Sequence, residues 1–176
     1  MEENKAVIYT RYNIKKSPDE LINDPKLIAC REFCEERGWH IVKECIDNGV
    51  SGSSIANQRA LMKYYDEIKE GKLNIQYVVG YKYSVFSRDF SGLLNYYMFL
   101  KKKDIKLIAV SEDEAGEKFS KLFDYYAGLL KGKHKIKLSE LEKISERVGS
   151  EYNFSETEII DKELFDKTVK KILNES

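Results

Sequence analysis

The stretch PKLIACREFCEERGWHIVKECI, residues 25–46, decides the fold because it changes from helical to strand periodicity within a few residues. Its first part predicts a helix over 25–37, with Asp24 as the N-cap, a proline in the first turn, and Gly38 ending the apolar repeat. Its second part, HIVKECI at residues 40–46, is short and rich in β-branched side chains, which predicts a strand. A helix followed at once by a strand is half of a β-α-β unit.

The same alternation continues on both sides of this stretch. Short aliphatic runs bounded by breakers predict three further strands, at residues 6–10, 75–81 and 105–110. Longer segments with apolar residues at helical spacing predict two further helices, at residues 58–70 and 90–103. The resulting order is typical of an α/β domain, so we expect a mostly parallel sheet of about four strands with flanking helices.

A long amphipathic helix is predicted over residues 116–131, after the fourth strand. Its apolar stripe either packs on the sheet or forms the interface of a homodimer or a mixed oligomer. The stripe consists of Phe119, Leu122, Phe123, Tyr126, Leu129 and Leu130. Two short helices are predicted beyond it, at 138–148 and 156–173. We therefore expect a domain over residues 1–130 that includes the interface helix, and a short helical extension over 131–176.

Composition and charge exclude several classes of protein. The chain has 176 residues, 42% of them hydrophobic, which suits one domain with a short appendage. Its 30 basic and 30 acidic side chains give no net charge, so the overall basic excess typical of a stand-alone nucleic-acid binder is missing. Residues 138–176 carry ten acidic and six basic side chains, a net charge of −4, which leaves +4 for residues 1–137. The acidic extension is therefore a poor candidate for a DNA-reading element.

No membrane, metal or cofactor partner is expected from the sequence. It has no run of about 18 apolar residues, and its start lacks the layout of a secretion signal, so a cytoplasmic protein is expected. Three cysteines without a CxxC pair predict neither a disulfide framework nor a zinc site, and we expect Cys30 and Cys34 in the core. Adjacent tyrosines, such as Tyr64 and Tyr65, are predicted to pack on helix faces rather than to stack on unpaired bases.

Four separated pieces of the sequence carry specific motifs. They are VIYTRYN at residues 7–13, IACREFCEERGWHIVKECIDNGVSGSS at 28–54, QRALMKYYDEIKEGK at 58–72 and VVGYKYSVFSRD at 78–89. In combination and in this order, they resemble the catalytic domain of the serine site-specific recombinases, the resolvase and invertase family. The resemblance covers roughly residues 5–130. It implies a resolvase-like fold and a connection to DNA recombination.

The resemblance also implies a chemistry. In that family a serine hydroxyl attacks a DNA phosphodiester and forms a phosphoserine link, with no metal or cofactor, while arginines stabilise the charge on the phosphoryl oxygens. The family's catalytic positions are matched in this sequence by Arg11, Asp47, Arg59 and Arg88. The implied DNA-phosphate contacts are Arg11, Ser51, Arg59, Lys82, Ser87 and Arg88.

Three positions depart from the family pattern. Asn13 stands where the nucleophilic serine belongs, and an amide cannot form a phosphoester. Ser84 replaces an aspartate and Val85 replaces a second arginine, which removes a candidate for proton transfer and one positive charge. These changes predict a domain that has kept the fold but has lost DNA cleavage.

Three hypotheses for function remain open. The first is a non-cutting partner or regulator of an active recombinase, which binds DNA weakly or through that partner. The second is an active site-specific recombinase or nicking enzyme with a displaced nucleophile, Ser17 or Ser84. The third keeps only the scaffold, with Arg11, Arg59 and Arg88 as an anion pocket for a nucleotide or a phosphorylated partner.

Overall fold

The structure, a computed structural model, describes residues 4–51, 58–88, 90–117 and 120–121. The chain divides into two compact units, Met1–Gly116 and Glu117–Ser176, and the fold described below is that of the first. The apolar stripe predicted on the long helix and the two helices predicted beyond it lie outside the described residues.

Four parallel strands form one sheet in the order β2-β1-β3-β4, which confirms the predicted architecture. The strands are β1 (Lys5–Tyr12), β2 (His40–Asn48), β3 (Tyr77–Gly80) and β4 (Lys106–Ala109). β1 lies in the interior of the sheet and pairs with β2 along its whole length, from Lys5 opposite His40 to Tyr12 opposite Asn48. The carboxyl ends of β1, β2 and β3 therefore lie next to one another at one edge.

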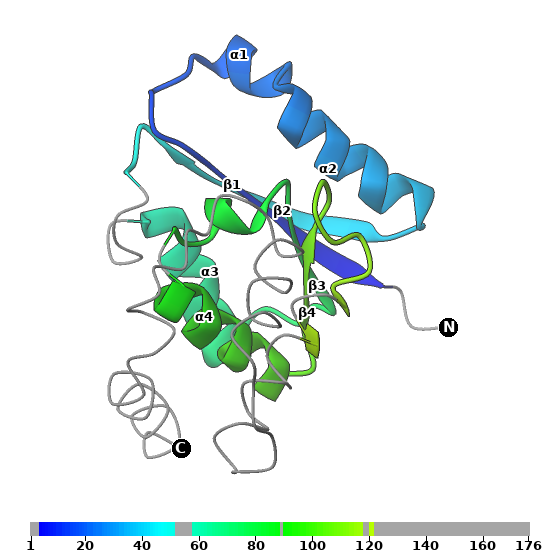
Figure 1. The fold of residues 1–176 in the computed structure, drawn as a ribbon. Coiled ribbons are helices and arrows are strands. Elements are labelled where there is room, and N and C mark those ends of the chain that lie inside the picture. The colour runs from blue at the N-terminus through cyan, green and yellow to red at the C-terminus, as the bar shows by residue number, and fades with distance from the viewer. Residues whose placement is uncertain (1–3, 52–57, 89, 118–119, 122–176) are drawn as a thin grey trace, which may run out of the picture. The chain divides into compact units, whose positions relative to one another are not determined.

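Helices cover both faces of the sheet. They are α1 (Pro18–Ile22), α2 (Pro25–Glu36), α3 (Arg59–Lys69) and α4 (Phe90–Lys102), with a 3₁₀ turn, η2 (Tyr83–Val85). Figure 1 shows α1 and α2 on one side of the strands and α3 and α4 on the other. The three predicted helices end within a residue or so of the observed bounds, whereas α1 and η2 were not predicted. Asp24 caps α2 as expected, because its carboxylate accepts from the backbone N–H groups of Lys26 and Leu27.

The core lies on both faces of the sheet. Under α2 it combines aliphatic side chains with Phe33 and contains the buried thiols of Cys30 and Cys34, as predicted. On the α3 and α4 side it is aromatic: the Phe86 ring packs between those of Tyr9 and Tyr96, with centroid distances of 5.5 and 5.6 Å. Tyr64 is fully buried there and its hydroxyl hydrogen-bonds that of Tyr96, which confirms the packing role expected for this tyrosine.

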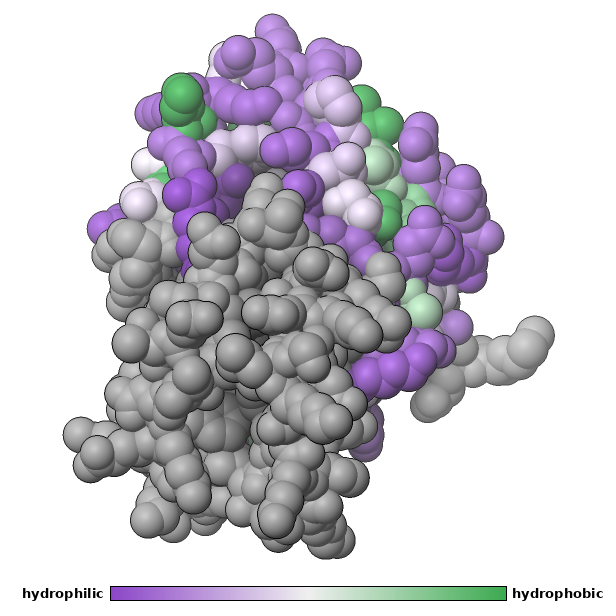
Figure 2. All heavy atoms as spheres, viewed as in Figure 1, coloured by the Kyte–Doolittle hydropathy of each residue, from purple (hydrophilic) through white to green (hydrophobic). Residues whose placement is uncertain are grey.

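The surface of the described residues is mainly hydrophilic in the view of Figure 2. Among these residues the exposed large hydrophobic side chains are Ile14 and Ile22. None of the described helices is both long and apolar enough to cross a membrane.

Candidate functional site

The candidate site lies at the carboxyl edge of the sheet, where three loops follow neighbouring strands. The first loop, residues 13–17, follows β1; the second, 49–51, follows β2; the third, 81–88, follows β3. Ligands of open α/β sheets bind at this edge because strand ends and loops converge there. The sheet order places the first loop between the other two.

Arg11 joins all three loops through its guanidinium group. Its Nη2 donates to the Ser84 carbonyl (3.0 Å), its Nε to the Val85 carbonyl (3.3 Å) and its Nη1 to the Val50 carbonyl (3.2 Å). Nη1 also donates to Oδ1 of Asn13. We call Arg11, the Asn13 side chain and these three carbonyls the Arg11 cluster. It brings the Asn13 side chain and the carbonyls of Ser84 and Val85 against one guanidinium.

Asp47 lies buried near the end of β2, and its carboxylate faces the first turn of α3. The carboxylate is 4% exposed and accepts from the backbone N–H groups of Ala60 (2.9 Å) and Leu61 (3.2 Å). The residue at the N-cap of α3, Gln58, makes no capping hydrogen bond with its own side chain. Asp47 therefore supplies the acceptor that the first turn of α3 needs. The structure gives it this capping role, and its catalytic role stays a prediction.

A buried polar network surrounds the same carboxylate. The Tyr9 hydroxyl lies 2.9 Å from Asp47 Oδ2 and 2.8 Å from Gln58 Oε1. Burial first, and then the negative charge of Asp47, raise the pKa of Tyr9 far above its usual value, so this phenol stays neutral. Gln58 is fully buried, and its Nε2 has no hydrogen-bond partner within the part of the chain that the structure describes. The network joins the ends of β1 and β2 to α3.

The third loop is held close to the sheet by buried anchors at both ends. The Tyr83 hydroxyl donates to Oδ2 of Asp113 (2.6 Å), and its backbone N–H donates to Oε2 of Glu112 (2.8 Å). Phe86 is fully buried, and its ring approaches Gly80 so closely that a Cβ on that glycine would lie 2.7 Å from Cζ. The end of β3 therefore requires glycine, and the carbonyls that bind Arg11 lie between two fixed points.

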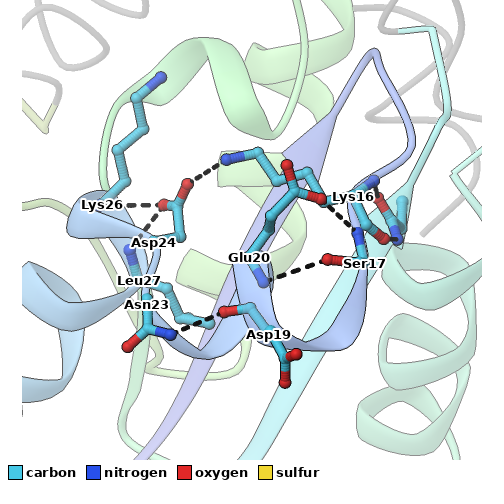
Figure 3. A network of polar contacts seen from close by, with 9 residues as sticks. Lys16, Ser17, Asp19, Glu20, Asn23, Asp24, Lys26 and Leu27 are labelled. Carbon is cyan, nitrogen blue, oxygen red and sulfur yellow. Dashed lines mark hydrogen bonds and ion pairs between the residues drawn. The ribbon is translucent and has the colours of Figure 1, made fainter.

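The first loop is fixed by side chains of neighbouring elements, as Figure 3 shows in part. The Asn48 amide binds both backbone groups of Lys16, at 2.8 Å each, and the Lys16 ammonium reaches Oδ2 of Asp24 at 2.5 Å. Ser17 is the N-cap of α1: its hydroxyl accepts from the Glu20 N–H (3.4 Å), and the Glu20 carboxylate accepts from the Ser17 N–H (2.7 Å). The hydroxyl proposed as a displaced nucleophile thus caps a helix.

The other residues predicted to meet phosphate lie around this edge. Arg59 is the first residue of α3 and is exposed, next to the amides that Asp47 caps. Arg88 is exposed at the end of the third loop, where Lys82 is half-buried and Ser87 is buried. Ser51 is exposed at the end of the described part of the second loop. Within the described ranges no group of three His, Cys, Asp or Glu side chains could hold a metal ion.

The structure is thus an α/β domain with a parallel sheet, an arginine at the end of an interior strand, and further arginines around the same edge. Residues 6–152 match the family model described as "Resolvase, N terminal domain", and the chain belongs to this family of serine recombinases. No curated protein sequence matches the chain. Membership confirms the resemblance seen in the sequence and links the chain to DNA recombination.

Solved structures of serine recombinases share the fold. A resolvase family site-specific recombinase from Streptococcus pneumoniae has a TM-score of 0.59 and 19% identity over 96% of this chain and 98% of that one. The N-terminal catalytic domain of TP901-1 integrase has a TM-score of 0.58 and 21% identity over 73% of this chain and 98% of that one. The C-terminal catalytic domain of ISC1926 TnpA, an IS607-like serine recombinase, has a TM-score of 0.50 and 17% identity over 82% of this chain and 97% of that one.

Proposed function

We propose that this chain is a resolvase-family domain that does not cut DNA and acts as a non-cutting partner or regulator of an active recombinase. The observation that carries the proposal is the hydrogen bond between Arg11 and Asn13. At the position implied for the nucleophile, an amide oxygen accepts from the guanidinium that the family pattern directs to phosphate. The site thus has an internal acceptor in place of an attacking hydroxyl.

The chemistry of strand cleavage explains why this change matters. Forming a phosphoserine link requires a hydroxyl that loses its proton and displaces the leaving oxygen of the phosphodiester. The Asn13 amide has no such oxygen, and the neighbouring third loop offers Ser84 and Val85 in place of a carboxylate and a guanidinium. Loss of a nucleophile alone lowers the rate by a factor on the order of 10⁶. The remaining arginines support binding rather than cutting.

The same proposal includes an assembly and a location. The apolar stripe of the predicted helix over 116–131 is the surface through which the chain pairs with itself or with an active recombinase. DNA is bound weakly or through that partner, since residues 1–137 carry a net charge of only +4. The cytoplasm is the proposed compartment, which suits three cysteines that are all free and buried.

One observation favours a second candidate, an active nicking enzyme or recombinase with a displaced nucleophile. Ser84 follows Lys82 and Tyr83 in the third loop, and its carbonyl lies 3.0 Å from Nη2 of Arg11. It is therefore next to an arginine that the resemblance assigns to phosphate binding. The Ser17 hydroxyl instead caps α1 by accepting from the Glu20 backbone N–H. The second candidate therefore depends on Ser84.

A covalent-adduct assay separates the two candidates. The purified protein is incubated with supercoiled plasmid carrying the DNA that flanks its own gene, stopped with detergent, and analysed for protein-linked strands. We expect no adduct from the wild type, and none from Asn13→Ser alone, because Ser84 and Val85 remain. An adduct formed by the wild type and lost in Ser84→Ala would overturn the proposal in favour of the second candidate. Tight binding of mononucleotides without duplex binding would instead favour the anion-pocket hypothesis.

A further inference from the structure

The guanidinium of Arg11 is already occupied by the protein's own acceptors. At least four of its N–H groups have partners: Nε and Nη2 donate to the consecutive carbonyls of Val85 and Ser84, and Nη1 donates to the Val50 carbonyl and Asn13 Oδ1. A phosphate binds arginine best through two parallel N–H groups on one edge of the guanidinium. The edge formed by Nε and Nη2, which suits that geometry, faces the third loop.

We infer that Arg11 is a positioning residue in this protein: it holds the first, second and third loops together, and the phosphate contacts fall to Arg59 and Arg88. The loop-holding half of the inference depends only on the structure. The phosphate half rests on the proposed function, because it assumes that this edge of the sheet meets DNA.

Displacing Arg11 toward a phosphate carries a clear cost. Each N–H that turns to the ligand leaves a carbonyl of Val50, Ser84 or Val85 without its donor in a part-buried setting. The third loop is fixed by Tyr83 and Phe86, so its carbonyls cannot move away with the guanidinium. An incoming phosphate therefore has to compete with several hydrogen bonds that are satisfied in advance.

Asn13 contributes to this arrangement directly. Its amide oxygen is the side-chain acceptor among the four partners, and it turns the Nη1 end of Arg11 back toward the first loop. The first loop is itself attached to the end of β2, because Asn48 binds both backbone groups of Lys16. The substitution at the nucleophile position thus supplies one of the four partners of Arg11, in addition to removing a hydroxyl.

Arg59 and Arg88 have the opposite placement. Both are exposed, one at the first turn of α3 and one at the end of the third loop. Among the described residues neither guanidinium donates to an internal acceptor, so each can meet a phosphate at no such cost. The N-terminus of α3 adds a favourable dipole for an anion near Arg59. These two side chains can therefore contact DNA phosphates while the Arg11 cluster stays intact.

The test compares Arg11→Gln with Arg59→Gln, an exposed arginine of the same edge, in the full-length chain. Hydrogen exchange is followed in peptides covering residues 48–51 and 81–88, together with the thermal midpoint. For Arg11→Gln we expect exchange at least tenfold faster in both peptides and a drop in Tm of about 5–10 °C. Arg11→Lys is expected to recover part of the protection, and Arg59→Gln to leave both readouts unchanged. Unchanged exchange and Tm in Arg11→Gln would overturn the loop-holding role.

A salt titration of duplex DNA binding tests the phosphate half. Each lost phosphate contact lowers the slope of log K against log salt concentration by about 0.9, which is expected for Arg59→Gln and Arg88→Gln. Arg11→Gln should change that slope by less than half as much; an equal change would overturn the assignment.

If Arg11→Gln does not fold, Asn13→Ala replaces it, with faster exchange expected at residues 48–51. If no variant or wild type binds duplex DNA, the proposed function fails together with the phosphate half, while exchange and Tm still decide the loop-holding role.

Discussion

Replacing Asp47 by alanine tests whether this buried carboxylate stabilises the fold. The substitution removes the acceptor for the backbone N–H groups of Ala60 and Leu61 and for the Tyr9 hydroxyl. Loss of a helix cap costs about 1 kcal/mol, and loss of a charged acceptor by a buried donor costs about 1–3 kcal/mol. The Tyr9 hydroxyl keeps a second neighbour, Gln58 Oε1 at 2.8 Å, so the total stays moderate. We expect Asp47→Ala to lower the free energy of unfolding by about 2–4 kcal/mol.

Urea unfolding followed by tryptophan fluorescence measures this loss. The single tryptophan, Trp39, stacks on Tyr77 with ring centroids 3.6 Å apart, so its emission reports on the sheet. Asp47→Asn keeps one acceptor oxygen and should lose about half as much stability. Asp66→Ala, at an exposed acid of the same helix, is the matched control and should stay within about 0.5 kcal/mol of the wild type. Equal midpoints for Asp47→Ala and Asp66→Ala at equal m-values would refute the reasoning.

Three further predictions follow from buried groups. Gly80→Ala places a Cβ 2.7 Å from Cζ of Phe86 and should cost about 1–3 kcal/mol in urea unfolding, with partial recovery in the double variant that also carries Phe86→Leu. Burial acts to raise the pKa of Asp24, but hydrogen bonds from Lys16 and the α2 backbone outweigh it and lower that pKa. The ionised carboxylate therefore stabilises the fold above an unfolded pKa of about 3.9, and this stabilisation is lost as the pH falls through the folded pKa. Asp24→Asn should consequently lose stability at pH 7 and show a flatter acid limb, and an unchanged limb would contradict this. Burial raises the pKa of all three thiols, to about 12 for Cys30 and to about 11 for Cys34 and Cys45, so they should resist alkylation at pH 8 until urea unfolds the protein, which mass spectrometry can follow.

The strands and the longer helices could be predicted because their periodicity is local. The run at residues 40–46 and the helix before it are bounded by Asp24 and Gly38, and each signal acts within a few residues of the element that it ends. The sheet order β2-β1-β3-β4 has no such local signal, because it depends on how helices pack across the two faces. The family resemblance implied a resolvase-like fold, and no strand order was predicted from the sequence.

The short helix α1 was missed although the sequence carries a readable signal. Ser17 and Glu20 form a capping box with a proline between them, and this pattern marks a helix start. The helix has only five residues and buries none of them, so it produces no apolar repeat to detect. The capping box was therefore the only sequence signal for α1, because the helix has no apolar periodicity.

The motifs proposed the candidate site residues, but the contacts of those residues could not be predicted from the motifs. Three of the partners of Arg11 are backbone carbonyls 39, 73 and 74 positions away, and a carbonyl is the same in every residue type. Asp47 was expected at a catalytic position, whereas its carboxylate oxygens accept hydrogen bonds from the backbone N–H groups 13 and 14 residues further on. Sequence patterns identified the side chains of this edge, whereas the pairing of those side chains with backbone required coordinates.

The use of main-chain oxygens by Arg11 also bears on how the domain tolerates mutation. A partner that is a backbone carbonyl survives any side-chain substitution that leaves the local chain path unchanged. The side chains at positions 84 and 85 can therefore change in chemistry while the N–H groups of Arg11 keep their acceptors. The arrangement of the three loops therefore does not depend on which side chains stand at those two positions.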